Sequence, residues 1–272
     1  KREDKAPFPF TGTSQCIKEH NDLYTVLSVR KSVHHSSVEQ DIIMYHHAPL
    51  MEFRTRVDWD ERQKMLRVEF PADIHTLTAR YDIAFGNVEH PNHSTTSYDE
   101  ARFEVCGHKW GDISDGSHGA ALMNDCKYGY TIQDSDMVLS LLRSADFPSD
   151  SCDKGVHTFS YWFYPHDGGI KEGRVAQAGY EANVPLLVQA GKAARDEHSY
   201  IHTNCDNIVI DTVKKSEDGE EIVLRIFETY NTVNDVVLTM GFSVDSCEET
   251  DLLERHLEDL PVTDGQIRFT IH

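Results

Sequence analysis

The stretch ARFEVCGHKWGDISDGSHGAALMNDCKYGY, residues 101–130, decides the fold and holds the main candidate site. Two short apolar segments within it, residues 103–106 and 119–123, have the length and composition of strands. The second leads into a polar turn at 124–129, where Gly129 permits unusual backbone angles. The segment between the two strands is predicted to be a loop. It concentrates polar and aromatic side chains, namely His108, Lys109, Trp110, Asp112, Asp115 and His118. A stacking ring, hydrogen-bonding Asp and Asn, and a cation are the groups that a sugar site needs.

Alternation of apolar and polar residues recurs along the chain and predicts an all-β protein. In residues 51–59 the odd positions are Met, Phe, Thr, Val and Trp, and the even ones are charged. Residues 77–85 and 222–227 repeat this period of two, which is typical of half-buried strands. Further predicted strands are 24–33, 65–70, 137–143, 158–164, 207–213, 236–244 and 267–271. Strands this frequent, without long helices between them, indicate antiparallel sandwiches.

Turn residues and composition divide the chain into two parts. The pair Asp218-Gly219 between two strand patterns predicts a hairpin, and the best helix candidate is the short segment 250–257. A soft boundary lies at 188–206, because the small and polar residues there show no alternation. We expect a large β-sandwich over residues 1–190 and a small β-domain over residues 200–272.

The bulk composition excludes several classes of partner. The chain has 272 residues and a formal net charge of −20, which repels phosphate backbones and anionic membrane surfaces. It contains no run of 18 apolar residues, so no membrane span is expected. The first residues lack the apolar core of a signal peptide, which predicts a cytoplasmic location. Because the first residue is Lys1 and not Met, we expect a piece of a longer protein.

The cysteines are sparse and carry no paired motif. They stand at positions 16, 106, 126, 152, 205 and 247, so a Cys-x-x-Cys zinc or redox motif is absent from the sequence. Cysteines within apolar segments are usually buried reduced thiols, and we expect this of Cys106 and Cys126. Free thiols fit a reducing cytoplasm.

Several spaced motifs together resemble one known family, the C-terminal region of glycoside hydrolase family 38, the class II α-mannosidases. The resemblance is to the cytosolic, vacuolar and bacterial branch, and it continues to about residue 228. The matching pieces occur in the family's order: Val57-Asp58-Trp59, Phe70-Pro71, the His-Lys-Trp-x-Asp motif of 108–112, the Asn-Asp-Cys-Lys-Tyr-Gly motif of 124–129, and Leu141-Leu142-Arg143-Ser144.

The resemblance implies both a fold and an activity. The fold would be all-β: a large antiparallel β-sandwich of the supersandwich, galactose-mutarotase-like type, followed by a small C-terminal β-sandwich. Family members are retaining enzymes that remove α-linked mannose from oligosaccharides. They use an Asp nucleophile, an Asp acid/base and a zinc-type metal in an N-terminal α/β domain.

This chain has no match to the family's metal motif or nucleophile strand. We therefore expect a non-catalytic part, with no catalytic residue, metal or other cofactor of its own. The catalytic domain of the same polypeptide and an α-mannoside oligosaccharide would be its partners. Catalysis by Asp112 and Asp115 alone is disfavoured, because a loop carboxylate pair is usually turn chemistry.

The turn at 124–129 is the strongest candidate for substrate contact. In the lysosomal and Golgi branch the matching turn projects towards the catalytic cleft, so the resemblance implies that Asp125, Lys127 and Tyr128 bind substrate. Here Cys126 and Lys127 stand where that branch has Arg and a small residue, and Lys lacks the planar fork of Arg. A purely structural turn is the open alternative.

The motif at 108–112 has two readings. His108, Trp110 and Asp112 either wall the sugar cleft or pack on the catalytic domain; alternatively, Trp110 caps the core and Asp112 bonds loop amides. Lys109 alternates with these residues and is expected to face the other side.

Two other sequence features are assigned structural roles. The aromatic cluster 161–164 is expected to pack, since half of any strand faces the core. The histidines are interpreted as structural or solvent-facing, because adjacent pairs such as His34-His35 are poor chelates.

Two other functions stay open. One is a stand-alone carbohydrate-binding module, which predicts mannose affinity by this chain alone. The other is a purely structural or oligomerisation domain, which predicts a stable homo-oligomer without sugar affinity.

Overall fold

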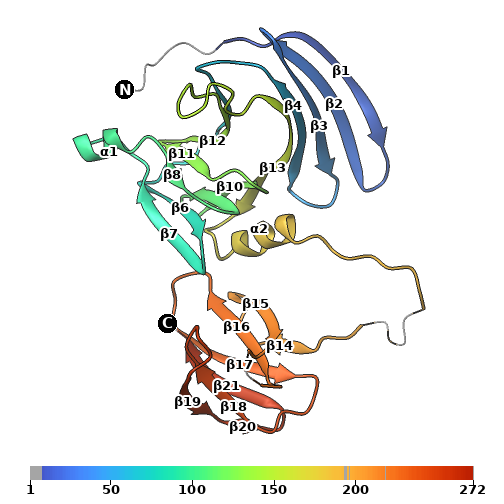
Figure 1. Cartoon of the computed structure of the whole chain (residues 1–272), viewed down its shortest axis with the longest axis vertical. Helices are drawn as coiled ribbons and strands as arrows, with labels where there is room; N and C mark the ends of the chain where they lie inside the picture. Colours follow the sequence, from blue (N-terminus) through green and yellow to red (C-terminus); the bar gives the residue numbers. More distant parts are fainter. Residues whose placement is uncertain (1–7, 193–194, 196, 218, 272) are drawn as a thin grey trace. The chain divides into compact units, whose positions relative to one another are not determined.

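The computed structural model describes residues 8–192, 195, 197–217 and 219–271. The chain forms two compact units, Lys1–Ile83 with Val88–Pro185, and Ala84–Asn87 with Leu186–His272. Strands dominate both units (Figure 1). The all-β class expected from the alternation is therefore confirmed.

The elements up to residue 183 include most of the strands. They are β1 (Thr11–His20), β2 (Tyr24–Val33), β3 (Ser36–Tyr45), β4 (Met51–Trp59), β5 (Met65–Pro71), β6 (Thr78–Ile83), β7 (Gly86–Pro91), α1 (Ser97–Ala101), β8 (Val105–Cys106), β9 (Trp110–Ser114), β10 (His118–Asn124), β11 (Gly129–Gln133), β12 (Asp136–Arg143), β13 (Gly155–Asp167) and α2 (Val175–Asn183).

Two antiparallel sheets enclose the core of the first unit. One has nine strands in the order β1-β2-β3-β4-β13-β10-β9-β6-β7, and the other has four in the order β5-β12-β11-β8. Buried side chains of both sheets form one apolar cluster, with Val57 and Leu122 from the first sheet and Tyr130 and Leu139 from the second. The first unit is therefore a β-sandwich whose core lies between the two sheets.

Strand β4 follows the alternation of its sequence. Phe53, Val57 and Trp59 are buried, and the charged side chains between them are exposed. Glu52 is the exception, because it is buried and accepts hydrogen bonds from the Tyr45 hydroxyl and the Arg54 guanidinium, both at 2.6 Å. A buried carboxylate is tolerated when it is paired in this way.

The aromatic cluster on β13 packs in the core, as expected. Tyr161 stacks on Phe53 with ring centroids 4.9 Å apart, and Phe163 stacks on Phe70 at the same distance. Offset stacks of this kind add to the stability gained from burial.

Residues 110–114 form a strand and not the expected loop. Strand β9 lies within the nine-stranded sheet between β10 and β6. The prediction was wrong because Asp112 made the segment look polar. In the fold Asp112 is 1% exposed and its Oδ2 lies 2.7 Å from Nε2 of His166, so its polarity is satisfied inside the protein.

Helix α2 was not expected from the sequence, because Gly179 near its middle lowers helix propensity by about 1 kcal/mol. The structure gives this glycine a packing role. A Cβ at Gly179 would lie 2.5 Å from Cδ1 of Trp110. Gly179 therefore lets the helix approach the fully buried Trp110 closely.

The second unit contains the remaining elements in three small sheets. They are β14 (Ile201–Thr203), β15 (Ile208–Lys215), β16 (Ile222–Glu228), β17 (Asn234–Met240), β18 (Cys247–Thr250), β19 (His256–Leu260), β20 (Val262–Thr263) and β21 (Gln266–Ile271). The sheets are β14-β17-β21-β20, β15-β16 and β18-β19. Ile208, Val236, Leu238 and Ile267 form the centre of its core. The predicted hairpin at 214–221 is present as β15–β16, although Asp218 lies outside the described residues.

The prediction of a helix at 250–257 is wrong, because these residues belong to the hairpin β18–β19. Asp251 closes the turn between the strands. Its Oδ1 accepts hydrogen bonds from the backbone N–H groups of Leu253 at 2.9 Å and Arg255 at 3.0 Å. Asp side chains stabilise such turns in competition with helix.

The six cysteines are all free. The expected burial of two of them is wrong, since Cys106 and Cys126 are exposed. Both stand at strand ends or beyond them, where the chain leaves the core.

In the part of the chain that the structure describes, no helix has the length and apolarity needed to cross a membrane.

Candidate functional site

Asn124, the last residue of β10, organises the turn at 124–129. It is 1% exposed. Its Oδ1 accepts a hydrogen bond from the backbone N–H of Lys127 at 2.5 Å, and its Nδ2 donates to the His108 carbonyl at 2.8 Å and the Tyr130 hydroxyl at 2.5 Å. The amide therefore connects the turn to the loop before β9 and to the core.

Asp125 ties the same turn to strand β13. Its backbone N–H donates to the carbonyl of Ser160 at 3.2 Å, and its Oδ2 accepts from the N–H of Ser160 at 2.9 Å. One carboxylate oxygen thus has a structural partner. A carboxylate has about four acceptor positions in all, so Asp125 keeps capacity for further donors.

A hollow of about 250 Å³ lies beside this turn. It is lined by His108, Lys109, Asn124, Asp125, Tyr128 and Asn183. The rings of His108 and Tyr128 meet edge to face with centroids 5.6 Å apart, and Tyr128 is 56% exposed. The hollow is smaller than pockets for drug-sized ligands.

Lys109 supplies the cation that lines the hollow. Its Nζ lies 3.4 Å from Oδ2 of Asp82 and 4.6 Å from the ring centroid of Tyr180. Burial raises the pKa of Asp82, although the hydrogen bonds and charge of Lys109 act in the opposite direction. The expectation that Lys109 faces away from His108 is wrong, because both residues line the same hollow.

Lys127 lies elsewhere on the turn. Its Nζ sits over the ring of Phe159, 4.5 Å from the centroid, and it is not among the residues that line the hollow. Such a cation–π contact is worth about 0.5–1 kcal/mol at an exposed site. The structure therefore gives the Lys127 side chain a partner within the fold.

Asn183 is a lining residue that sequence reasoning missed, because it is the last residue of the unexpected helix α2. Its Nδ2 donates to the carbonyl of Asn124 at 3.0 Å and to that of Gly179 at 2.9 Å. The one signal in the sequence for this lining residue is its position, since Asn183 is a polar residue at the end of the Ala-containing segment 175–183.

Of the motif at 108–112, His108 and Lys109 reach the hollow. Trp110 and Asp112 are each 1% exposed. Trp110 packs against helix α2, and Asp112 bonds His166. These two side chains are therefore used inside the fold and expose almost no surface to a ligand.

Cys126 is expected to react slowly with thiol reagents although it is exposed. Burial of the sulfur, followed by the hydrogen bond and charge of Asp125, raises the pKa of the Cys126 thiol to about 11. At pH 8 about 0.1% is then thiolate, and even with its higher intrinsic nucleophilicity we expect roughly tenfold slower alkylation than for a free thiol. Iodoacetamide labelling followed by peptide mass spectrometry measures this rate.

Cys106 in the same chain provides the internal comparison for that measurement. Asp125→Asn should speed the labelling of Cys126 and leave the labelling of Cys106 unchanged. Equal rates for Cys106 and Cys126 in the wild-type chain would contradict the expectation.

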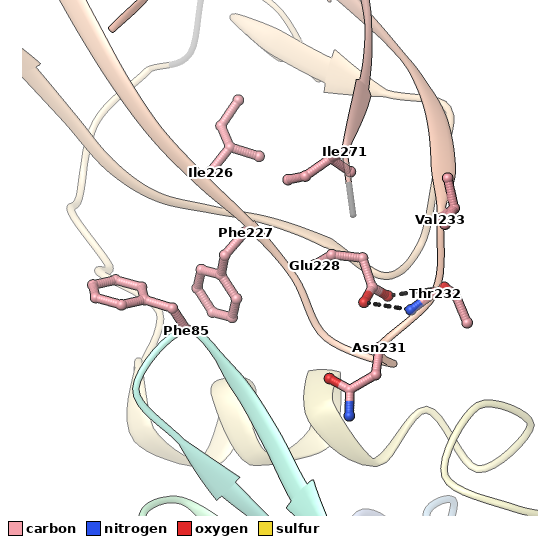
Figure 2. Close-up of a pocket in the computed structure, with 8 residues that line it drawn as sticks. All are labelled: Phe85, Ile226, Phe227, Glu228, Asn231, Thr232, Val233 and Ile271. Atoms are coloured by element: carbon pink, nitrogen blue, oxygen red, sulfur yellow. Dashed lines mark hydrogen bonds between the residues drawn. The ribbon is translucent and has the colours of Figure 1, made fainter. Parts of the chain in front are cut away.

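A second hollow, of about 360 Å³, lies in the second unit (Figure 2). Phe85 and Phe227 meet there edge to face at 5.6 Å. Glu228 accepts hydrogen bonds from the backbone N–H groups of Tyr230 at 2.7 Å and Thr232 at 3.0 Å, and from the Asn207 amide. This carboxylate holds the turn after β16, so we assign the hollow a structural role.

Two family models match the chain. The model described as the glycosyl hydrolases family 38 C-terminal domain matches residues 2–151. The model described as the glycosyl hydrolases family 38 C-terminal beta sandwich domain matches residues 207–272. The two matches fall mainly within the first and the second unit, respectively.

Curated relatives and solved structures agree with these models. Alpha-mannosidase G of Dictyostelium discoideum is 42% identical over 71% of this chain, which spans 18% of that protein. Alpha-mannosidase 2C1 of Homo sapiens is 38% identical over 81% of this chain, which spans 22% of that protein. The chain thus spans about a fifth of the length of these relatives.

An alpha-mannosidase structure from Enterococcus faecalis V583 is similar in fold, with a TM-score of 0.79 and 18% identity. The match covers 95% of this chain and 35% of that protein. The expected order of a large β-sandwich and then a small one is confirmed. By its sequence and its fold, the chain belongs to the C-terminal region of glycosyl hydrolase family 38.

Proposed function

We propose that this chain is the non-catalytic C-terminal part of an α-mannosidase that hydrolyses terminal α-linked mannose of oligosaccharides. The family membership and the names of the relatives support this proposal. Hydrolysis would be retaining and would occur in a catalytic α/β domain of the same polypeptide. The two compact units would correspond to domains over residues 1–190 and 200–272, and the protein would be cytoplasmic, in keeping with its free cysteines.

The hollow beside the turn at 124–128 carries the proposal that the chain also contributes substrate contacts. Sugar hydroxyls both donate and accept hydrogen bonds. The hollow faces them with the carboxylate of Asp125, the phenol of Tyr128, the imidazole of His108 and the ammonium of Lys109. The Tyr128 hydroxyl has no hydrogen bond to any other residue in the described ranges, so it is available to a ligand. We therefore keep Asp125 and Tyr128 from the sequence analysis and move the binding cation from Lys127 to Lys109.

The zinc-type metal implied by the family does not fit this hollow. Among the described residues, the only group of three or more His, Cys, Asp or Glu ligand atoms within 4.8 Å of one another lies elsewhere, in the second unit. We place the catalytic metal in the catalytic domain, and no step of hydrolysis is assigned to the residues of this chain.

Replacing Asp125 by asparagine in the full-length enzyme is expected to lower kcat/KM for an aryl α-mannoside roughly ten- to hundredfold. A hydrogen bond to a charged group contributes about 1.5–3 kcal/mol. When a substitution removes such a bond from the transition state, the whole of that free energy appears as a decrease in kcat/KM. Asparagine can still accept the bond from Ser160, so the melting temperature of the 272-residue chain should hold. Tyr128→Phe should lose about two- to tenfold, as for a neutral hydrogen bond.

Two further variants make this test discriminating. Asp136→Asn removes one exposed charge at the start of β12, away from the hollow, and should leave kinetics unchanged. Lys109→Met should impair kinetics more than Lys127→Met; the reverse order would return the binding cation to Lys127. Wild-type kinetics for both Asp125→Asn and Tyr128→Phe would overturn the substrate contact.

The competing functions are separated with the 272-residue chain itself. Under our proposal it has no α-mannosidase turnover and no measurable mannose affinity, with or without added zinc. Calorimetric binding of mannose would favour a stand-alone carbohydrate-binding module. A stable homo-oligomer in sedimentation, together with unimpaired kinetics of the variants above, would favour a structural or oligomerisation domain.

A further inference from the structure

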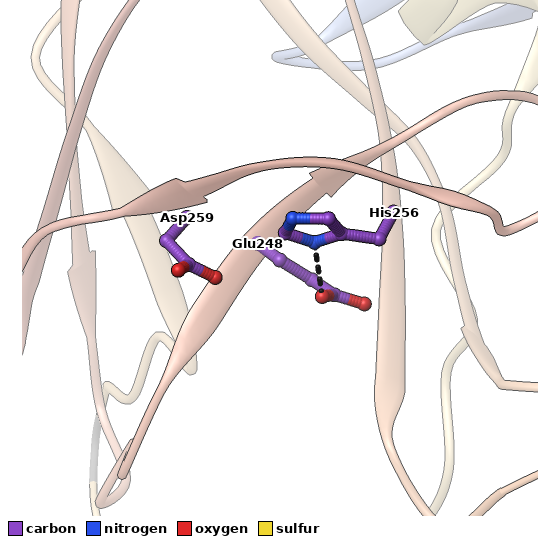
Figure 3. Close-up of side chains that lie close together, drawn as sticks. All are labelled: Glu248, His256 and Asp259. Carbon is purple, nitrogen blue, oxygen red and sulfur yellow. Dashed lines mark hydrogen bonds and ion pairs between the residues drawn. The ribbon is translucent and has the colours of Figure 1, made fainter.

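The hairpin β18–β19 brings three metal-ligating side chains together on one face (Figure 3). Glu248 comes from β18, and His256 and Asp259 come from β19. One ligand atom from each lies within 4.8 Å of the other two. All three side chains are exposed to solvent, so an ion could reach them directly.

A β-bulge creates this convergence. Glu248 pairs with Asp259 and Glu249 with Glu258, but Thr250 then pairs with His256, so the register skips one residue of β19. Residues three apart in a regular strand face opposite sides, which would turn His256 away from Asp259. The extra residue turns the imidazole to the face of the two carboxylates, a known effect of bulges on side-chain direction.

Two carboxylates meet on this face of the hairpin, and only one of them has a partner within the described part of the chain. Glu248 and Asp259 are directly opposite each other, and like charges in that position destabilise a hairpin. His256 Nδ1 lies 2.7 Å from Oε2 of Glu248. Asp259, in contrast, makes no side-chain hydrogen bond or ion pair with any other residue that the structure describes. A cation bound between the strands would relieve the repulsion and give Asp259 a partner.

We propose that Glu248, His256 and Asp259 bind a divalent transition-metal ion, with zinc as the best match. Zinc accepts imidazole nitrogen and carboxylate oxygen at 2.0–2.2 Å, whereas magnesium and calcium prefer shells of oxygen alone. Tetrahedral bonds of that length place ligand atoms roughly 3.4 Å apart. Rotation of exposed side chains closes the present separation without disturbing the core.

The proposed ion has a structural consequence. A two-stranded hairpin is marginally stable by itself, and this sheet consists of β18 and β19 alone. An ion bound by both strands would cross-link the hairpin and stabilise it. Solvent would occupy the fourth coordination position of the ion. The proposal departs from the sequence expectation of no metal in this chain, and it does not depend on the proposed function.

The test uses the whole 272-residue chain, stripped of metal with a chelator and titrated with zinc chloride. Calorimetry should detect one saturable zinc site that His256→Ala and His256→Gln both lack. The binding isotherm should saturate at one equivalent, and the melting temperature of the wild-type chain should keep rising with the logarithm of the free zinc concentration above Kd. Because the chain has 16 histidines, the difference between wild type and variant is the decisive quantity.

The opposite face of the same hairpin offers a matched control. Glu249 and Glu258 form the neighbouring like-charged pair, so Glu249→Gln removes the same charge as Glu248→Gln from the other face. Glu248→Gln should weaken zinc binding about tenfold or more, as expected for a direct ligand when outer-shell partners already cost 10–100-fold. Glu249→Gln should change it by less than about twofold.

Three outcomes would overturn the proposal. The first is equal weakening by Glu248→Gln and Glu249→Gln, which means diffuse attraction of cations to an acidic hairpin. The second is unchanged zinc stoichiometry in both His256 variants. The third is an equal rise in melting temperature with magnesium at the same concentration. The circular dichroism spectra of the metal-free variants must match the wild type, and Glu248→Gln provides the second route if a His256 variant fails to fold.

Discussion

Replacing Asp112 by alanine is expected to lower the free energy of unfolding by about 3–5 kcal/mol, the usual cost of removing one partner of a buried ion pair. The side chains of Asp112 and His166 are 1% and 2% exposed, and Oδ2 lies 2.7 Å from Nε2. Burial lowers the pKa of His166, but the hydrogen bond and charge of Asp112 outweigh this and raise it. Without Asp112 the imidazole stays buried and its Nε2 loses its partner, while Nδ1 keeps the carbonyl of Asp167 at 3.3 Å. Thermal unfolding should show a fall of roughly 6–20 °C in Tm.

Two comparisons distinguish the loss of the Asp112–His166 pair from the general effect of replacing an aspartate. Asp58→Ala removes an exposed carboxylate from the outer face of β4 and should change stability by no more than about 0.5 kcal/mol. Because the folded-state pKa of His166 is raised, its added stabilisation is present below about pH 6.5 and is lost as pH rises through the raised pKa. The stability difference between wild type and His166→Gln should shrink over that range. A cost below about 1 kcal/mol for Asp112→Ala would contradict the assigned role.

Replacing Tyr130 by alanine should also cost about 3–5 kcal/mol, as for large aromatic side chains removed from a core. Tyr130 is fully buried. Its ring fills the space left by two glycines, since a Cβ would approach it to 2.9 Å at Gly107 and 3.0 Å at Gly111. Its hydroxyl donates to the carbonyl of Leu122 at 3.1 Å and accepts from the Asn124 amide. Urea denaturation of the chain measures the cost.

The variant Tyr130→Phe tests the link between this core residue and the candidate site. It keeps the ring but removes the partner of two buried polar groups, which costs about 1–3 kcal/mol. Asn124 also holds the backbone N–H of Lys127, so that amide should lose protection from hydrogen exchange. Tyr98→Ala, at a side chain 84% exposed, is the control and should have little effect. Unchanged stability and exchange in Tyr130→Phe would contradict the link.

The positions of strands were predictable wherever apolar and polar residues alternate within a single strand. Strands β2 and β4 have the predicted bounds, because each period of two is set by neighbouring residues and needs no distant partner. The family was also predictable, since several spaced motifs can be recognised in the sequence without knowing the fold. Among the site residues, Asp125 and Tyr128 were identified in this way and both line the hollow.

Other features depended on residues far apart in the chain. Strand β9 was missed because Asp112 is satisfied by His166, 54 residues away. Helix α2, and with it Asn183, was missed because Gly179 is explained only by its contact with Trp110.

The direction of single side chains likewise depended on tertiary contacts. Lys109 reaches the hollow beside Asp82, whereas Lys127 lies on Phe159. At the hairpin β18–β19, one skipped residue in the register joins His256 to two carboxylates. The sequence by itself determined which residues form strands and which family the chain belongs to, because those signals are local or linear. The tertiary structure decided which polar groups meet, because pairing across strands and packing between sheets set the direction of each side chain.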